Sequence, residues 1–216
     1  MLTTGVLLPQ LAFACLLQRV RPPFYTEKVT LSGGNPTLRR NRIHDDNQGG
    51  VFVYENGQGT LEDNEIFGNA AAGLEIRDGG NPTLRRNIIH DGKAGGVFVH
   101  QNGQGALEDN DIFGNAYSGV TIREGGNPTL RRNRINRNAH NAVRVYKEGA
   151  GTVEDNDLRD NALGAWDISA DSEAKVKRAR NLEDEAGTEA RVKAGRIDAL
   201  DFDDDFDDDF LEELDR

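Results

Sequence analysis

The chain has 216 residues, one cysteine, and 37 acidic against 26 basic side chains, which gives a net charge of −11. Residues 182–216 hold 15 of the acids and 4 of the bases, so this segment alone carries −11. The rest has 37 − 15 = 22 acids and 26 − 4 = 22 bases. Because residues 1–181 carry no net charge, nucleic acid is not expected as a partner. A single cysteine excludes an internal disulfide framework.

The first 28 residues form an apolar segment with no Lys or Arg before Arg19. A secretory signal peptide has a basic n-region, which this segment lacks. Pro9 suits the first position of a helix, so we expect a short helix over residues 10–20. We predict that residues 1–28 cap the repeats that follow, because the end coils of a solenoid need cover. We also expect a cytoplasmic protein, with secretion as the alternative.

Residues 29–181 repeat with a period of 23 residues. The nine residues GGNPTLRRN recur at intervals of 46, beginning at Gly33, Gly79 and Gly125, and each interval holds two related units. Within a unit, short period-2 segments lie between turns rich in Gly and Asn, and no apolar stripe of period 3.6 is present. We therefore predict an all-β fold, a right-handed parallel β-helix of about six to seven coils.

Four columns at 23-residue steps stay apolar, and they begin at Leu38, Ile43, Val51 and Val53. The Leu38 column is expected to continue through Val153 to Val176. A fifth column stays asparagine, and its members are Asn41, Asn64, Asn87, Asn110, Asn133 and Asn156. A buried amide without a partner costs several kcal/mol, whereas amides stacked in register bond to one another. We assign these asparagines to structure and not to binding.

Two further columns alternate in charge from coil to coil, which explains the 46-residue pattern. They read Arg39, Glu62, Arg85, Glu108, Arg131, Glu154, Lys177 and Arg40, Asp63, Arg86, Asp109, Arg132, Asp155, Arg178. Opposite charges on neighbouring strands attract one another. We therefore expect ion-pair ladders here, in preference to a phosphate-binding surface.

The strand that begins at Val51 leaves two outward columns that stability does not explain. They hold aromatic and charged side chains: Phe52, Tyr54, Glu75, Arg77, Phe98, His100, Arg123, Arg144 and Tyr146. Tyr and Arg dominate many protein interfaces, and aromatic rings beside Arg also suit sugars. We predict a protein-binding face, with a carbohydrate ligand and ordinary cross-strand stacking as the alternatives.

The sequence offers no catalytic, cofactor or metal motif. Glycosidic cleavage needs two carboxyl groups about 5–9.5 Å apart, but Glu75 and Glu124 are expected two coils apart. His44 and His90 are each followed by Asp, yet they too are expected two coils apart and therefore too far apart to share a metal ion. With no zinc spacing and no phosphate-binding loop, we favour a protein without enzymatic activity, cofactor or metal.

Residues 182–216 form an acidic tail in which Phe202, Phe206 and Phe210 recur every four residues between runs of Asp. On a helix these rings would share one face. Asp is a poor helix former and like charges repel, so we expect the free tail to be disordered. Three roles stay open: a solubilising tail, a segment that folds on a basic partner with an apolar groove, or a weak calcium site, although no EF-hand or nonapeptide calcium repeat is present.

Several segments resemble a known family: GGNPTLRRN, NIIHDG at residues 87–92, GGVFV, and NGQGALEDNDIFGNA at residues 102–116. Over residues 29–168 they resemble the right-handed β-helix repeats of the pectate-lyase-like superfamily. The closest likeness is to the carbohydrate-binding and sugar-hydrolase repeats of F-box β-helix proteins and their bacterial relatives. For F-box members this resemblance implies recognition of a substrate protein in the ubiquitin pathway. The catalytic Asp and Arg clusters of the lyases, hydrolases and epimerases have no matching residues here.

Together these patterns predict a non-enzymatic β-helix interaction module that recognises a protein, without nucleic acid as a partner and without a membrane span. The alternative is a carbohydrate-binding or polysaccharide-processing β-helix protein. A fragment or divergent copy of a longer protein is a third interpretation.

Overall fold

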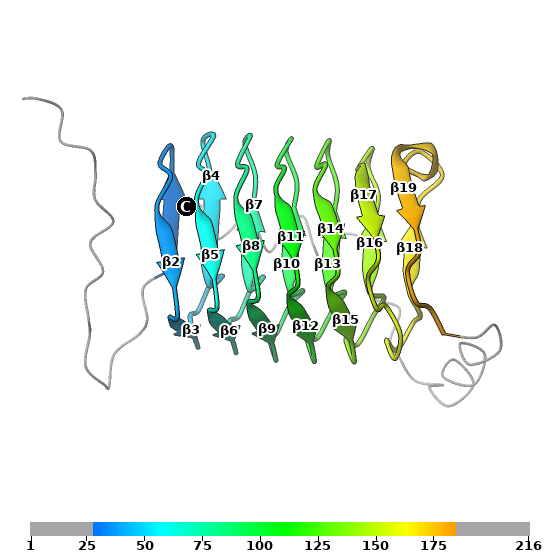
Figure 1. Ribbon diagram of the computed structural model, residues 1–216, viewed down its shortest axis with the longest axis horizontal. Helices are drawn as coiled ribbons and strands as arrows, with labels where there is room; N and C mark the ends of the chain where they lie inside the picture. The colour runs from blue at the N-terminus through cyan, green and yellow to red at the C-terminus, as the bar shows by residue number, and fades with distance from the viewer. Residues whose placement is uncertain (1–27, 185–216) are drawn as a thin grey trace, which may run out of the picture.

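A computed structural model describes residues 28–184 of the chain. The predicted cap and the acidic tail, with Phe202, Phe206 and Phe210, lie outside the described residues, so the expectations for them stay predictions. The strands begin at Val29 and end at Ala179. They wind as a solenoid, whose coils follow one another from β2 and β3 at one end to β18 and β19 at the other (Figure 1).

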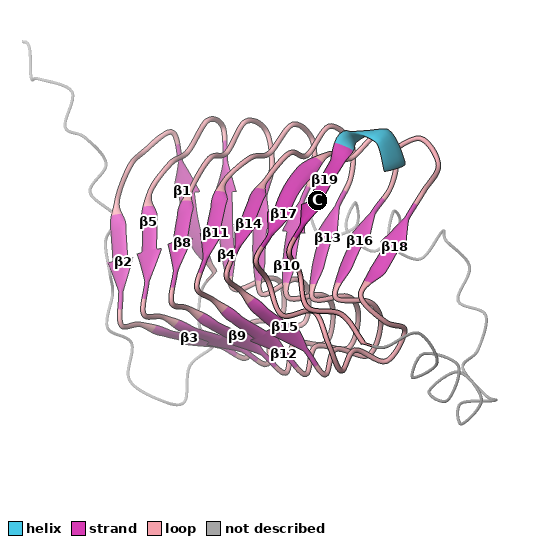
Figure 2. Ribbon diagram, turned by 45° about the vertical axis from the view of Figure 1, so that its right-hand side comes forward, coloured by secondary structure: helices cyan, strands magenta, loops and turns pink. Residues whose placement is uncertain are grey.

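Three parallel sheets run along the solenoid (Figure 2). Sheet A contains β1 (Val29–Ser32), β4 (Val51–Tyr54), β7 (Leu74–Ile76), β10 (Val97–Val99), β13 (Val120–Ile122), β16 (Val143–Val145) and β18 (Trp166–Ile168). Sheet B contains β2 (Thr37–Arg39), β5 (Thr60–Glu62), β8 (Thr83–Arg85), β11 (Ala106–Glu108), β14 (Thr129–Arg131), β17 (Gly151–Glu154) and β19 (Val176–Ala179). Sheet C contains β3 (Arg42–His44), β6 (Glu65–Phe67), β9 (Ile88–His90), β12 (Asp111–Phe113) and β15 (Arg134–Asn136).

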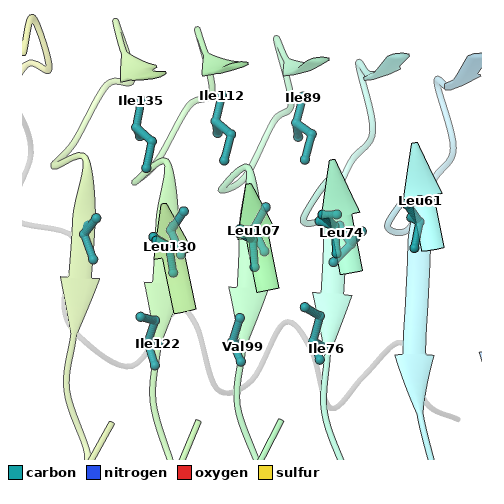
Figure 3. Packing of buried hydrophobic residues seen from close by; sticks show 14 of the residues in the cluster. Leu61, Leu74, Ile76, Ile89, Val99, Leu107, Ile112, Ile122, Leu130 and Ile135 are labelled. Carbon is teal, nitrogen blue, oxygen red and sulfur yellow. The ribbon is translucent and has the colours of Figure 1, made fainter. Parts of the chain in front are cut away.

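The core is one continuous stack of the predicted apolar columns. Successive side chains of a strand point to opposite faces. The middle residue of each three-residue strand in sheets B and C therefore points inward, as do the first and third residues in sheet A. Figure 3 shows Ile89, Ile112 and Ile135 stacked along the axis, and all three are buried. Each such side chain contributes about 1.5–3 kcal/mol when buried. The continuous core and the three parallel sheets confirm the predicted β-solenoid.

The last coil departs from the 23-residue step. Leu107 pairs with Leu130 as predicted, but Val153 pairs with Arg178, a step of 178 − 153 = 25 residues. The prediction that the Leu38 column continues from Val153 to Val176 is therefore wrong. Two extra residues are accommodated in the turn before β19, where a short 3₁₀ helix, η1 (Glu173–Lys175), precedes the strand.

The predicted asparagines lie in one row at the corner between sheets B and C. At a typical position the backbone N–H and the Nδ2 of Asn87 both donate to Oδ1 of Asn110, at 2.9 and 3.0 Å. The same Nδ2 also donates to the carbonyl of Leu61 at 2.8 Å. From Asn64 to Asn156 these residues are at most 2% exposed. The row extends to a seventh member, because Asn156 Nδ2 donates to Asn181 Oδ1 at 3.0 Å.

The residue before each of these asparagines has a positive φ. The values run from 52° to 58°, at Arg40, Asp63, Arg86, Asp109, Arg132, Asp155 and Arg180. A residue with a side chain in this left-handed region costs roughly 1–2 kcal/mol. Every coil therefore has an unfavourable bend at this corner, and the amide row that follows directly provides hydrogen bonds that hold it.

A second asparagine row, which the sequence analysis missed, lies beyond sheet C. Asn115 Nδ2 donates to Asn138 Oδ1, and Asn138 Nδ2 donates to Asn161 Oδ1, both at 2.9 Å. Gly92 interrupts this row, since it offers only its backbone N–H to Asn115 Oδ1 at 3.1 Å. One coil before the gap, Asn69 Nδ2 is buried and has no hydrogen-bond partner among the described residues.

We expect Asn110→Ala to lower the free energy of unfolding by about 2–4 kcal/mol, because the buried backbone N–H of Asn87 loses its acceptor and Asn87 Nδ2 keeps only the Leu61 carbonyl. Asn41→Ala is the matched control at the partly exposed end of the row. It removes only its own side-chain bond to Asn64 and should cost roughly 1 kcal/mol. Urea denaturation followed by circular dichroism measures the free energy of unfolding of both variants. Equal losses in the two variants would contradict a special stabilising role for the buried part of the row.

Gly92→Asn should raise the stability by about 1 kcal/mol, because its amide would accept from Asn69 Nδ2 and complete the second row. A Cβ at position 92 would meet only Asn115 Oδ1 at 3.1 Å at close range, so a small shift of that amide accommodates it. Gly92→Ala adds the Cβ without the amide and is the control. If the thermal midpoint of Gly92→Asn were no higher than that of Gly92→Ala, the absence of an amide at position 92 would not be what lowers the stability of the second row.

Candidate interaction face

The structure places the nine predicted binding residues in adjacent coils, at outward positions of the sheet A strands or directly after these strands. We call this surface, together with Thr121 of its first column, the sheet A face. Phe52 pairs in register with Glu75, and Glu75 with Phe98. Phe98 pairs with Thr121, and Thr121 with Arg144. The second column, Tyr54, Arg77, His100, Arg123 and Tyr146, lies two residues further along each coil.

The centre of the face is buried although its side chains point away from the core. Glu75, Phe98, His100 and Arg123 are 5–8% exposed, whereas the outward side chains of β5, β8, β11 and β14 in sheet B are half-buried or exposed. Part of the reason is stacking: the rings of Phe98 and His100 lie 4.2 Å apart at 13°. The Arg123 guanidinium lies 5.0 Å above Phe98.

His100 lies between two carboxylates. Its Nε2 is 3.2 Å from Glu75 Oε1 and its Nδ1 is 3.9 Å from Glu124 Oε2. Arg77 Nε is 3.2 Å from Glu75 Oε1, and Arg123 Nε is 3.6 Å from Glu124 Oε1. The sequence analysis expected Glu75 and Glu124 to lie two coils apart. Their strands do lie that far apart, but one imidazole ring occupies the space between the two carboxylates.

Arginines alternate with aromatic rings toward both ends of the face. Arg77 lies 5.4 Å above the ring of Tyr54, and Arg144 lies 4.7 Å above that of Tyr146. Arg144 also pairs with Asp167 at 3.1 Å. A guanidinium that stacks on a ring keeps the fork of N–H donors at its edge, which matches a carboxylate. This face therefore combines aromatic rings with guanidinium groups that already contact carboxylates.

The outer surface of sheet B holds the predicted ion-pair ladders. Arg86 Nε donates to Asp63 Oδ1 at 2.9 Å, and this bond lowers the pKa of the Asp63 carboxyl. Arg132 Nε does the same for Asp109 at 2.8 Å. Since each of these arginines has a carboxylate partner in the neighbouring coil, sheet B offers neutralised pairs and no basic surface for phosphate.

The last pair of this ladder differs from the prediction. Arg178 was expected beside Asp155, but Arg180 takes that position, with its Nε 2.6 Å from Asp155 Oδ1. Arg178 instead contacts Glu173. Lys177 was expected beside Glu154 and pairs with Thr152. The two extra residues before β19 cause all three differences, because they shift the last strand against its neighbour.

Sheet C has a stack of rings that the sequence analysis did not find. His44, Phe67, His90 and Phe113 follow one another with ring centroids 4.7, 5.1 and 5.0 Å apart. Their alternation at 23-residue steps was the available signal. The phenyl ring of Phe67 lies between the two imidazoles. Among residues 28–184, no group of three or more His, Cys, Asp or Glu side chains is placed to hold a metal ion.

A sequence profile described as a right-handed beta helix region matches residues 29–180. The chain belongs to this right-handed β-helix family. The matched range coincides with strands β1 to β19, and membership confirms the predicted hand of the solenoid. No curated protein and no solved structure matches the chain. Within the described residues, no helix is long and apolar enough to cross a membrane.

We expect Arg132→Gln to weaken the dependence of stability on acid. The hydrogen bond from Arg132 lowers the pKa of Asp109 below its ordinary value. The stabilisation from this pair is therefore fully present above about pH 4 and is lost as the pH falls through the lowered pKa. Thermal midpoints between pH 6 and pH 2 should fall less steeply in the variant than in the wild type.

The control for this measurement is Arg137→Gln. Arg137 contacts the Asn136 amide and the Phe113 ring, which do not titrate in this range. It should keep the wild-type slope. If the slope of Arg132→Gln also equalled that of the wild type, the ladder would not contribute to acid stability.

Proposed function

We propose that the protein is a non-enzymatic interaction module whose sheet A face recognises a segment of another protein that carries acidic and aromatic side chains. The observation that carries this proposal is the buried cluster of Phe98, His100 and Arg123 on the solvent side of a sheet. Its stacked aromatic rings distinguish it from the ion-pair ladders of sheet B.

The cluster has the properties of a preorganised binding site. Aromatic and arginine side chains provide most of the energy in many interfaces, particularly where they are buried and surrounded by packed neighbours. The side chains at the centre of this face already contact one another, so binding would fix few additional rotamers. Arg77, Arg123 and Arg144 already contact Glu75, Glu124 and Asp167, so the acidic side chains of a partner would exchange with these contacts.

A carbohydrate ligand is the second candidate. It is favoured by the carboxylates of Glu75 and Glu124 on either side of His100, because paired carboxyl groups flank the scissile bond in glycosidases. A sugar, however, stacks on the open face of an aromatic ring. Phe98 is 8% exposed, with His100 and Arg123 against its ring. The ring of Phe98 is therefore not open for a sugar to stack on.

The resemblance to F-box β-helix proteins extends the proposal to substrate recognition in the ubiquitin pathway, in the cytoplasm. Support for this part comes from the repeat segments alone. Determining the N-terminal residue of the protein isolated from its source would test the location, since cleavage within residues 1–28 would indicate export.

The test is selection from a random peptide display library on the immobilised full chain, with a glycan array probed in parallel. We expect enrichment of peptides with Asp or Glu beside Phe or Tyr. Tyr54→Ala with Arg123→Ala should weaken their binding by about tenfold or more. Thr129→Ala with Arg131→Ala changes outward residues of sheet B and should leave binding unchanged.

Circular dichroism must show that both double variants keep the fold. Peptides that bind the two variants equally would contradict the assignment of the face. Glycans that bind in a manner sensitive to Tyr54 and Arg123, with no enriched peptides, would establish the second candidate in place of the first.

A further inference from the structure

We propose that Arg178 closes the C-terminal end of the solenoid and keeps a second copy of the chain from stacking on it. The inference goes beyond the proposed function, because it concerns the last coil and not the sheet A face. β18 and β19 are the last strands of sheets A and B (Figure 1). A free strand edge beside an apolar core is a template for a further strand, so such an end needs a device that stops addition.

The two extra residues of the last coil decide which side chain ends the core. At the regular step of 23 residues, as between Leu107 and Leu130, Val176 would follow Val153 in the core column. The pairing of β17 with β19 instead places Arg178 beside Val153, which is fully buried. The departure from the repeat therefore ends this apolar column on a guanidinium and not on an isopropyl group.

The Arg178 side chain lies across the end of the core. Trp166 ends a second core column, in register with Val143 of β16, and its indole packs against the buried cluster. The Arg178 guanidinium lies 5.5 Å above this ring. It thus connects the last strand of sheet B with the last strand of sheet A. The face of an indole attracts a cation, which holds the charge over the apolar core.

The lengthened turn also supplies the partner of this guanidinium. η1 (Glu173–Lys175) occupies the turn, and the Glu173 carboxylate contacts Arg178. Lys175 Nζ lies 3.8 Å from Glu148 Oε1 of the preceding coil, which links the turn to that coil. Both side chains of the Arg178–Glu173 pair are exposed. The pair therefore keeps its outer side in water, and a coil stacked on this end would remove that water.

The opposite end of the solenoid begins its core columns with apolar side chains, Leu38 of β2 and Ile43 of β3 among them. If a second copy continued the asparagine row head to tail, its Leu38 would lie on Arg178 of the first copy, and its Arg40 would follow Arg180. If two C-terminal ends met, two guanidinium groups would lie between the joined cores. Both arrangements bury a charge against apolar side chains or bring like charges together, and both are therefore unfavourable.

The experiment is sedimentation velocity on the full chain, with wild type compared to Arg178→Leu. We expect the self-association constant of Arg178→Leu to be at least about tenfold higher, because leucine continues the apolar column and leaves two strand edges beside an apolar surface. Arg178→Lys keeps a charge at the end of the column and should associate no more than the wild type.

Lys177→Leu is the matched control. Lys177 precedes Arg178 in β19 and pairs with Thr152, at an outward position of sheet B. This substitution adds the same apolar side chain to the same edge strand but outside the core column, so the wild-type association constant should be kept. An equal rise for Lys177→Leu and Arg178→Leu would overturn the proposal, because general stickiness of the edge would then suffice.

Circular dichroism must show that each variant keeps the β-sheet spectrum. If Arg178→Leu does not, Arg178→Met takes its place with the same expectation, since it is apolar and unbranched. A variant of either kind that folds and associates no more than the wild type would overturn the proposal. Association that Tyr54→Ala with Arg123→Ala abolishes would place the contact on the sheet A face and would equally overturn it.

Discussion

The structure depends on the row of stacked asparagines at the corner between sheets B and C. Each coil bends there through a left-handed residue such as Arg86, a conformation that disfavours any residue with a Cβ. The next residue, Asn87, joins its backbone and side chain to the coil above and to the carbonyl of Leu61 below. The bend and the row occur together in every coil, so the hydrogen bonds offset an unfavourable backbone where it arises.

This row also sets the register from which the surface follows. A slip of one residue would take every amide away from its acceptor and turn every apolar side chain outward. With the register set, residues 23 apart become neighbours, and chemistry spread along the chain is gathered into columns. Sheet B gathers opposite charges. Sheet A gathers Phe98, His100 and Arg123 into one cluster, although these residues come from different coils.

The sequence was sufficient for the period, the apolar columns and the solenoid, because these depend on spacing alone. It failed where spacing changes: nothing in the residues around Glu173 marks two extra positions, so Val176 and Arg178 were placed wrongly. The second asparagine row was readable at Asn115, Asn138 and Asn161, but Gly92 concealed its continuity. That the His100 imidazole lies within 3.2 Å of Glu75 and 3.9 Å of Glu124 depends on side-chain rotamers, which the sequence columns do not specify.

The alternating charges of sheet B impose a parity rule on the length of the solenoid. If the coil of Arg85 and Arg86 were deleted, Glu62 and Asp63 would stack directly against Glu108 and Asp109. Like charges on neighbouring strands repel, so losing or gaining one coil penalises the fold, while losing or gaining two preserves every pair. The unit that can be duplicated without placing like charges together is thus the 46-residue pair of coils, whereas the structural repeat is the 23-residue coil. Such a chain is expected to grow by duplication of 46-residue doublets, which accounts for GGNPTLRRN recurring nearly unchanged in alternate coils.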